Sequence, residues 1–149
     1  MKGITPIISI IILLLITVGL AAAAWTYMGN YFSSIVSKTI EIPTQKCVSG
    51  TIAMVIIHNM GTENINIATD IVVLKSDGNP VGDEQLGWCD LDAATCSFNQ
   101  TEGFDIATIA TGQYGKALIN CTTTGFAKTC TYDFIVASRT NTVNVYCPG

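Results

Sequence analysis

Cysteine is the residue type in this chain with the clearest chemical potential, because it forms disulfides, binds metals and carries redox chemistry. The 149-residue sequence contains six cysteines and a single histidine, His58. Zinc sites and dithiol redox motifs place two ligands or thiols about two to four residues apart. The closest cysteines here, Cys89 and Cys96, have six residues between them. An even number of cysteines in a small domain therefore indicates disulfides formed in an oxidising compartment.

The spacing of the cysteines suggests a pairing, although other pairings remain open. Two pairs of sequence neighbours each close a short loop, and one of these loops lies between two expected strands, where a disulfide would clamp a hairpin. The first and last cysteines would then join the two ends of the domain, and closing such a loop of about 100 residues is worth roughly 4–5 kcal/mol in the chain-entropy relation. The hypothesis pairs Cys47 with Cys147, Cys89 with Cys96, and Cys121 with Cys130.

No other group of side chains predicts catalysis or ligand binding. His58 lies within a strand-like run and is expected to be a structural residue rather than a base. Acidic residues beside Cys89 offer oxygen ligands for Ca²⁺, but their spacing is not that of an EF-hand loop, so a solvated acidic loop is the simpler interpretation. We therefore expect no enzyme activity, no cofactor and no bound metal. The acidic residues are Asp83, Glu84, Asp90 and Asp92.

Two asparagines carry the Asn-x-Ser/Thr signature of N-glycosylation. They are Asn99, in Asn-Gln-Thr, and Asn120, in Asn-Cys-Thr. Glycans at these positions would suit an exported protein. Cys121 is expected to crowd the second site, and the alternative is that both sequons occur by chance and stay unmodified.

The charge distribution excludes one large class of partners. From Cys47 onward there are four basic and ten acidic residues, a formal charge of about −6. Nucleic-acid binding depends on Lys and Arg that neutralise phosphates, and these residues form no basic stripe here. We expect no nucleic-acid partner.

The N-terminal segment is apolar over a length that is typical of a membrane-spanning helix. Residues 3–37 contain no Asp, Glu, Lys or Arg, and Ile4 to Met28 is long enough to cross a bilayer as a helix. Small residues at Ala21–Ala24 leave a secretory signal peptide as an alternative. Because the apolar pattern continues and Pro6 is the last proline before Pro43, we predict one helix over residues 4–42.

The first residues of the chain resemble a known family. Met1-Lys2-Gly3, followed by Ile4-Thr5-Pro6-Ile7-Ile8, is similar to the leader and mature start of archaeal type IV pilins, which carry a class III signal peptide. The resemblance implies cleavage of the leader, residues 1–3, by a prepilin peptidase between Gly3 and Ile4. It also implies assembly by an ATP-driven platform. Bacterial pilins usually carry Glu at the fifth mature position, which is Ile8 here, and this departure leaves open how the subunit register is set.

The same resemblance assigns the helix to polymerisation. The helix would span the membrane in the precursor and form the filament core after assembly, and small residues such as Gly19 would let neighbouring helices approach closely. The glycine-rich start of archaellins is absent, which favours an adhesive pilus over a motility filament. The residues expected to take part are Pro6, Ile8, Leu13, Gly19, Ala22 and Trp25.

The rest of the chain, residues 47–149, has the pattern of an all-β domain. Short runs rich in β-branched and aromatic residues alternate with turn signals such as Asn59-Met60-Gly61 and Arg139-Thr140, which predicts an antiparallel, Ig-like β-sandwich. The fold class is thus α+β, a long hydrophobic helix followed by a disulfide-linked sandwich. The expected strands are residues 51–59, 70–76, 114–120, 129–138 and 141–147.

These observations together predict the structural subunit of an extracellular filament on the archaeal cell surface, a helical homopolymer that serves adhesion. Its precursor would lie in the cell membrane. Three alternatives remain open. They are a single-pass, membrane-anchored extracellular binding protein, an archaellin-like motility subunit, and a minor rather than major pilin.

Overall fold

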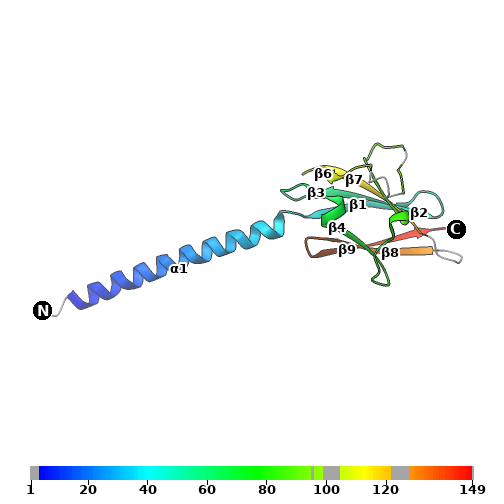
Figure 1. Cartoon of the computed structure of the whole chain (residues 1–149). Helices are drawn as coiled ribbons and strands as arrows, with labels where there is room; N and C mark the ends of the chain where they lie inside the picture. Colours follow the sequence, from blue (N-terminus) through cyan, green and yellow to red (C-terminus); the bar gives the residue numbers. More distant parts are fainter. Residues whose placement is uncertain (1–3, 95, 99–104, 122–127, 149) are drawn as a thin grey trace. The chain divides into compact units, whose positions relative to one another are not determined.

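The structure is a computed structural model that describes residues 4–94, 96–98, 105–121 and 128–148. It divides between Ile35 and Val36 into two units, an N-terminal helix and a β-domain (Figure 1).

Helix α1 comprises Ile4–Val36. Its 33 residues span about 50 Å at the standard rise, and Pro6 lies in the first turn, where a missing N–H group costs no hydrogen bond. The predicted helix over residues 4–42 is therefore too long at its C-terminal end. Residues 40–42 belong instead to the first strand, because Pro43 disfavours helical backbone in the residue before it and the buried side chain of Ile40 lies in the core of the β-domain. The β-domain was predicted to begin at residue 47, but it begins at Val36.

Two antiparallel sheets form the β-domain. The first has the order β1 (Ile40–Cys47), β2 (Ile52–Asn59), β7 (Tyr114–Asn120) and β5 (Leu86–Cys89). The second has the order β4 (Ile71–Lys75), β8 (Lys128–Val136) and β9 (Arg139–Cys147). The smaller elements are the pair β3 (Ile65–Asn66) and β6 (Thr108–Ile109), the one-turn helix α2 (Ile67–Asp70) and the 3-10 turn η1 (Asp83–Gln85).

The strand order is that of an immunoglobulin domain. If the strands of the two large sheets are lettered A to G in chain order, the first sheet is A-B-E-D and the second is C-F-G, which is the constant-type arrangement. The prediction of an α+β chain with an Ig-like antiparallel sandwich is confirmed. The disulfides differ from those of antibody domains, which link strands B and F, because here Cys47 on the first strand is bonded to Cys147 on the last.

The core lies between the two sheets and follows from the alternation of buried and exposed side chains along strands such as β2. In β2 every second side chain is buried, among them Ala53, Val55 and Ile57, as expected for a strand with one face on a core. Across the core, the rings of Trp88 and Phe134 meet edge to face with their centroids 6.4 Å apart, a favoured aromatic geometry. The wholly buried apolar side chains also include Ile65, Ile109, Ile119, Val136 and Val143.

Four strands and one turn differ from the sequence-based expectation. Strand β1 was not expected, and its residues 40–42 lie in the predicted helix. Strand β5 was not expected either, because its four residues are all buried and show no alternation. The pair β3 and β6 has only two residues in each strand, too few to form a recognisable pattern. The last hairpin turns at Ala137-Ser138, two residues before the expected Arg139-Thr140, because Val136 pairs directly with Arg139. Both turn residues have positive φ, 48° and 67°, as in the type I′ turns that match the twist of a hairpin.

Candidate functional site

The surface of α1 is the candidate functional site. Seven consecutive residues, Ile10 to Ile16, are all Ile or Leu and are between 52% and 66% exposed. Because one helical turn takes 3.6 residues, this run presents apolar side chains on every face of the helix. A helix that is apolar all round needs a surrounding apolar environment, either a membrane or the core of an assembly.

The apolar part of α1 is long enough for either environment. Pro6–Ser33 is a candidate membrane span of 28 residues, and none of its most apolar stretch is buried within the chain. Its length of about 42 Å exceeds the hydrocarbon thickness of a bilayer, about 30 Å. Length and composition alone therefore permit a membrane span.

The two threonines of the apolar span do not present unpaired hydroxyl groups. The hydroxyl of Thr17 donates to the carbonyl oxygen of Leu14 at 2.9 Å, and that of Thr26 donates to Ala23 at 2.9 Å. Such bonds to the preceding turn lower the cost of placing these residues in an apolar environment.

The residues predicted to take part in polymerisation do not lie along one face of α1. Beyond the first turn, they are distributed around the helix. Ile8 and Gly19 are eleven residues apart, about three full turns, so they share a face, whereas Leu13 lies on another. Gly19 has no atom within 4 Å of the position of an added Cβ. Of the processing site, Gly3 lies outside the described residues and Ile4 is the first residue of α1. The set comprises Pro6, Ile8, Leu13, Gly19, Ala22 and Trp25.

Residues 37–39, here termed the linking segment, connect α1 to β1 and are bonded to the β-domain. The Glu63 amide donates to the carbonyl oxygen of Ser37 at 2.9 Å, and the Met60 amide donates to that of Thr39 at 2.9 Å. A Cβ added to Gly61 would overlap the backbone of Ser37 and Thr39, so only glycine allows this close approach. The chain is thus fixed to the β-domain from Ser37 onward.

Asn59 organises the turn that holds the linking segment. It is wholly buried, and its side-chain amide donates to the carbonyl oxygens of Glu63 at 2.8 Å and Ile109 at 2.9 Å. Its side-chain oxygen accepts from the Gly61 amide at 2.9 Å. A buried side-chain amide is tolerated only when it is hydrogen-bonded in this way. The Asn-x-Gly turn signal was visible in the sequence, but its role in holding the chain after the helix was not.

An ion pair adds to this attachment. The Lys38 ammonium lies 2.8 Å from a carboxylate oxygen of Asp70, and the other oxygen accepts from the Asn66 amide at 2.8 Å. The hydrogen bond from Lys38, followed by that from Asn66, lowers the pKa of Asp70 below its ordinary value of 3.8 because both favour the ionised form. No local pattern predicted this ion pair, because Lys38 and Asp70 are far apart along the chain.

The three disulfides have the pairing that was expected. The Cα atoms are 5.2 Å apart in Cys47–Cys147, 5.6 Å in Cys89–Cys96 and 6.2 Å in Cys121–Cys130, all within the usual range. The first connects the two sheets, because Cys47 ends β1 and Cys147 ends β9.

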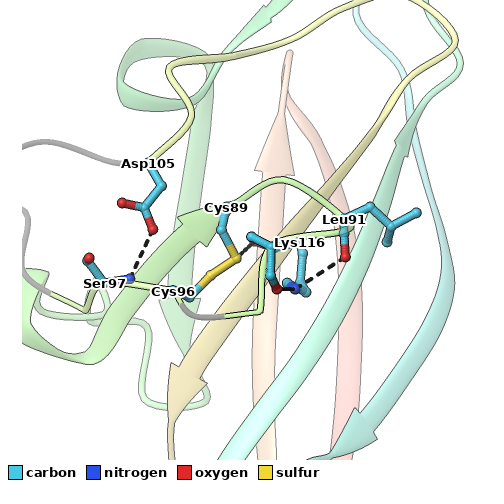
Figure 2. The surroundings of a disulfide bond; sticks show 7 residues. Cys89, Leu91, Cys96, Ser97, Asp105 and Lys116 are labelled. Carbon is cyan, nitrogen blue, oxygen red and sulfur yellow. Dashed lines mark hydrogen bonds between the residues drawn. A yellow bond between two sulfur atoms is a disulfide. The ribbon is translucent and has the colours of Figure 1, made fainter.

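The loop closed by Cys89 and Cys96 is held against the first sheet (Figure 2). The ammonium of Lys116, on β7, donates to the carbonyl oxygens of Leu91 at 3.3 Å and Ala93 at 2.6 Å. The positive charge is thereby directed at backbone dipoles of an acidic loop, which favours the ordered loop. The sequence contained no signal for this contact because Lys116 and the loop are far apart along the chain.

Of the two sequons, the structure describes one asparagine. Asn120 is half-buried at the end of β7, and its side-chain oxygen is buried without a hydrogen-bond partner among the described residues. It lines a pocket with a volume of about 220 Å³, together with Lys75, Asp77 and Tyr132. Burial raises the pKa of the Tyr132 hydroxyl. Asn99 lies outside the described residues.

His58 lies on the outer face of the first sheet. Its ring stacks on Tyr114 with centroids 4.3 Å apart, and its Nε2 atom is 3.3 Å from the carbonyl oxygen of Gly112. Within the part of the chain that the structure describes, no three His, Cys, Asp or Glu side chains come together as a metal site. The acidic residues Asp90 and Asp92 follow β5 in an exposed loop.

Comparison with known proteins leaves the family open. No protein-family model and no curated protein matches the chain. Among solved structures, the archaellum periplasmic stator protein FlaG from Sulfolobus acidocaldarius is similar, with 15% sequence identity and a TM-score of 0.42 over 73% of this chain and 96% of that chain. Because the identity is low and the TM-score is below 0.5, this similarity does not identify the function.

Proposed function

We propose that this chain is the structural subunit of an extracellular archaeal filament of the type IV pilus class, which polymerises through α1 and serves adhesion. The observation that carries the proposal is the run from Ile10 to Ile16, which exposes apolar side chains on every face of the helix. The resemblance of the first residues to archaeal type IV pilins supports the same proposal and adds removal of residues 1–3.

Burial of α1 gives the filament its strength. Between Ile4 and Leu20 the helix has twelve Ile, Leu and Val residues, and full burial at ~1.5–3 kcal/mol each gives a gross term on the order of 20–35 kcal/mol. This value is an upper bound, but even a fraction of it makes release of a subunit into water negligible.

The assembly step requires more than apolar burial. Before assembly the helix is surrounded by lipid, which is about as apolar as neighbouring helices, so transfer from membrane to filament gains little from the hydrophobic effect. Close packing around small residues such as Gly19 and Ala22 supplies part of the free energy that assembly requires. An ATP-driven platform supplies the remainder of that free energy.

The β-domain would then form the outer layer of the filament. Its disulfides suit an oxidising exterior, and the linking segment is bonded to the domain through Ser37 and Thr39. No catalytic role, cofactor or nucleic-acid partner is part of the proposal, and glycans at Asn99 and Asn120 are consistent with an exported filament.

The experiment that tests the proposal is N-terminal sequencing of protein recovered from the cell surface, combined with sedimentation in detergent. We expect a mature terminus at Ile4 and polymers that sediment. A chain that retains Met1 and stays monodisperse in micelles would instead be a single-pass anchored binding protein, and the proposal would be wrong.

A further inference from the structure

The C-terminal third of α1 differs from the rest of the helix because it has one apolar side and one polar side. A helix turns by about 100° per residue, so Thr26, Asn30 and Ser33 lie together on one side. The large side chains on the opposite side, here termed the aromatic stripe, are between 57% and 78% exposed. The aromatic stripe consists of Tyr27, Met28, Tyr31 and Phe32.

The length of α1 places the aromatic stripe beyond the lipid. The helix spans about 50 Å, whereas the hydrocarbon layer of a bilayer is about 30 Å thick. About 13 of its 33 residues therefore lie outside the hydrocarbon. The run from Ile10 to Ile16 has no polar side chain and belongs within the lipid, which leaves the part with two unlike sides outside. An apolar side in that position needs another apolar surface to cover it.

Strand β2 carries a second exposed apolar surface. A strand with one face on a core usually turns polar side chains outward. In β2 the outward residues are apolar as well, and they are partly exposed. The row that they form, here termed the β2 row, is about 14 Å long at the rise of a strand, enough to receive the aromatic stripe. The β2 row consists of Ile52, Met54 and Ile56.

The neighbouring strands define the borders of the β2 row. On β1, Thr44 and Lys46 pair with residues of the row, and both are exposed. On β7, the Lys116 ammonium donates to the carbonyl oxygens of Leu91 and Ala93 (Figure 2). The loop that follows β5 is therefore held beside β7, while the row itself stays partly exposed.

Charge selects the kind of partner that the β2 row accepts. Carboxylates lie around it, since Glu41 is 3.9 Å from His58 at one end of β2 and the loop after β5 contains Asp90 and Asp92. A second β-domain is equally acidic, so the two domains would repel each other at this face. Residues 3–37 contain no charged side chain, and α1 of a second copy therefore approaches without that repulsion.

We propose that the aromatic stripe of one copy docks on the β2 row of a second copy of this chain. An amphipathic helix binds in this way when its apolar side lies on an apolar surface, and aromatic side chains are common anchors of such contacts. Thr26, Asn30 and Ser33 then remain on the solvent side. The inference deepens the proposed function, and its consequence for the filament rests on that function.

The docking joins two unlike surfaces, which decides what it builds. Each copy presents one aromatic stripe and one β2 row, so the contact repeats from copy to copy into an open helical polymer. A contact between like surfaces would stop at a dimer. Because Ile8, at the fifth mature position, has no carboxylate to set the register of the subunits, the docking sets that register instead.

Photo-crosslinking of the full-length chain tests the docking directly. A tagged copy with benzoylphenylalanine in place of Phe32 is produced together with untagged wild-type copies. We expect a crosslinked pair of a tagged and an untagged copy, joined at the β2 row. The same photoreactive residue in place of Ser33 should give about tenfold less of this pair, because that side of the helix faces away from the contact. A crosslink within the tagged copy, or to a different protein, would overturn the proposal.

Substitution of Met54 tests the contact from the other side. Met54→Lys places a charge in the β2 row, and burial of an unpaired charge opposes docking, so the crosslinked pair should fall by about tenfold. Val72→Lys is the matched control, since Val72 is a 47% exposed strand residue of the other sheet, and it should leave the yield unchanged. Equal yields from the two variants would overturn the proposal. Both should keep the thermal midpoint of the wild type in micelles, which checks that the β-domain is folded.

The outcomes separate this inference from the proposed function. Polymers that contain the crosslinked pair support both. Polymers in which the probe at Phe32 reacts only with other helices overturn the docking and leave the filament intact. A crosslinked pair in the membranes of cells that form no polymer supports the docking and contradicts the filament. The absence of both the pair and the polymer contradicts both.

Discussion

Cys47 and Cys147 are joined by a disulfide with their Cα atoms 5.2 Å apart, so that the first and last strands of the Ig-like domain are covalently linked across 100 residues. The bond spans the two sheets at the side where β1 and β9 end. It restricts the unfolded chain far more than the short loop of Cys89 and Cys96 does, because the entropy of loop closure grows with loop length.

The first prediction concerns this disulfide. Replacement of Cys47 and Cys147 by alanine should lower the free energy of unfolding of the β-domain by about 4–5 kcal/mol, whereas the same replacement of Cys89 and Cys96, which are 7 residues apart, should cost about 2–3 kcal/mol. Chemical denaturation of the full-length chain in detergent measures both. Equal losses would show that the loop-length account does not apply here.

The second prediction concerns pH and the ion pair between Lys38 and Asp70. Because the pKa of Asp70 in the folded chain lies below 3.8, its ionisation stabilises the folded state above about pH 4, and this stabilisation is lost as the pH falls through the lowered pKa. Asp70→Asn should remove that pH dependence and cost about 0.5–1 kcal/mol at pH 7.

Thermal unfolding between pH 2 and pH 7 provides the measurement for Asp70. Glu63→Gln, which removes an exposed carboxylate from the turn that follows β2, is the control. If Asp70→Asn and the wild type lost stability in parallel as the pH fell, the ion pair would not be the source of the effect.

The third prediction concerns the attachment of the linking segment. Gly61→Ala should destabilise the β-domain by about 1–3 kcal/mol, because the added Cβ overlaps the backbone of Ser37 and Thr39. Gly82→Ala is the matched control, since Gly82 has open space around its Cβ position and an ordinary φ of −66°, and it should be neutral or slightly stabilising. Proteolysis near residue 37 should increase only in the Gly61 variant. An unchanged cleavage rate would count against the attachment.

The fourth prediction concerns the hairpin turn between β8 and β9. Ala137 and Ser138 both have positive φ, a conformation that costs about 1–2 kcal/mol for ordinary residues and little for Asn or Gly. The double change Ala137→Asn and Ser138→Gly should therefore raise the free energy of unfolding by about 1 kcal/mol. Denaturant midpoints with an unchanged slope are the readout, and a lower midpoint would mean that the turn is not type I′.

The fifth prediction concerns packing between copies of α1. Gly19 has no atom within 4 Å of its Cβ position in the single chain, so Gly19→Leu should leave membrane insertion intact and add about 0.8 kcal/mol of helix propensity. Close packing of helices around Gly19 would not accommodate the larger side chain. We expect few or no sedimentable polymers from Gly19→Leu and normal polymers from the neighbouring control, Val18→Leu. Normal polymers from both would place Gly19 away from the helix contacts.

The fold was largely predictable from the sequence because its main elements have strong local patterns. The charge-free segment before Lys38 predicted the helix, the run of β-branched residues at 51–59 predicted β2, and the cysteine spacing predicted the disulfide pairs. The helix end was not predictable in this way, since Ile40 and Ile42 continue the apolar pattern of α1. Only pairing with β2 and burial of Ile40 assign them to a strand, and these are tertiary effects.

Only the part of the candidate site that depends on the amino-acid composition of α1 was predictable from the sequence. The apolar surface of α1 follows directly from its residues. In contrast, the attachment of the linking segment depends on contacts between residues distant in sequence, such as the bond from Asn59 to Ile109 and the ion pair from Lys38 to Asp70.

Electron cryo-microscopy of detergent-washed material from the cell surface would show whether α1 forms the core of a filament. We expect continuous filaments whose axis is filled by closely packed helices corresponding to residues 4–36, with the β-domains around them. Particles that remain monodisperse in micelles, each with a single helix surrounded by detergent, would contradict it.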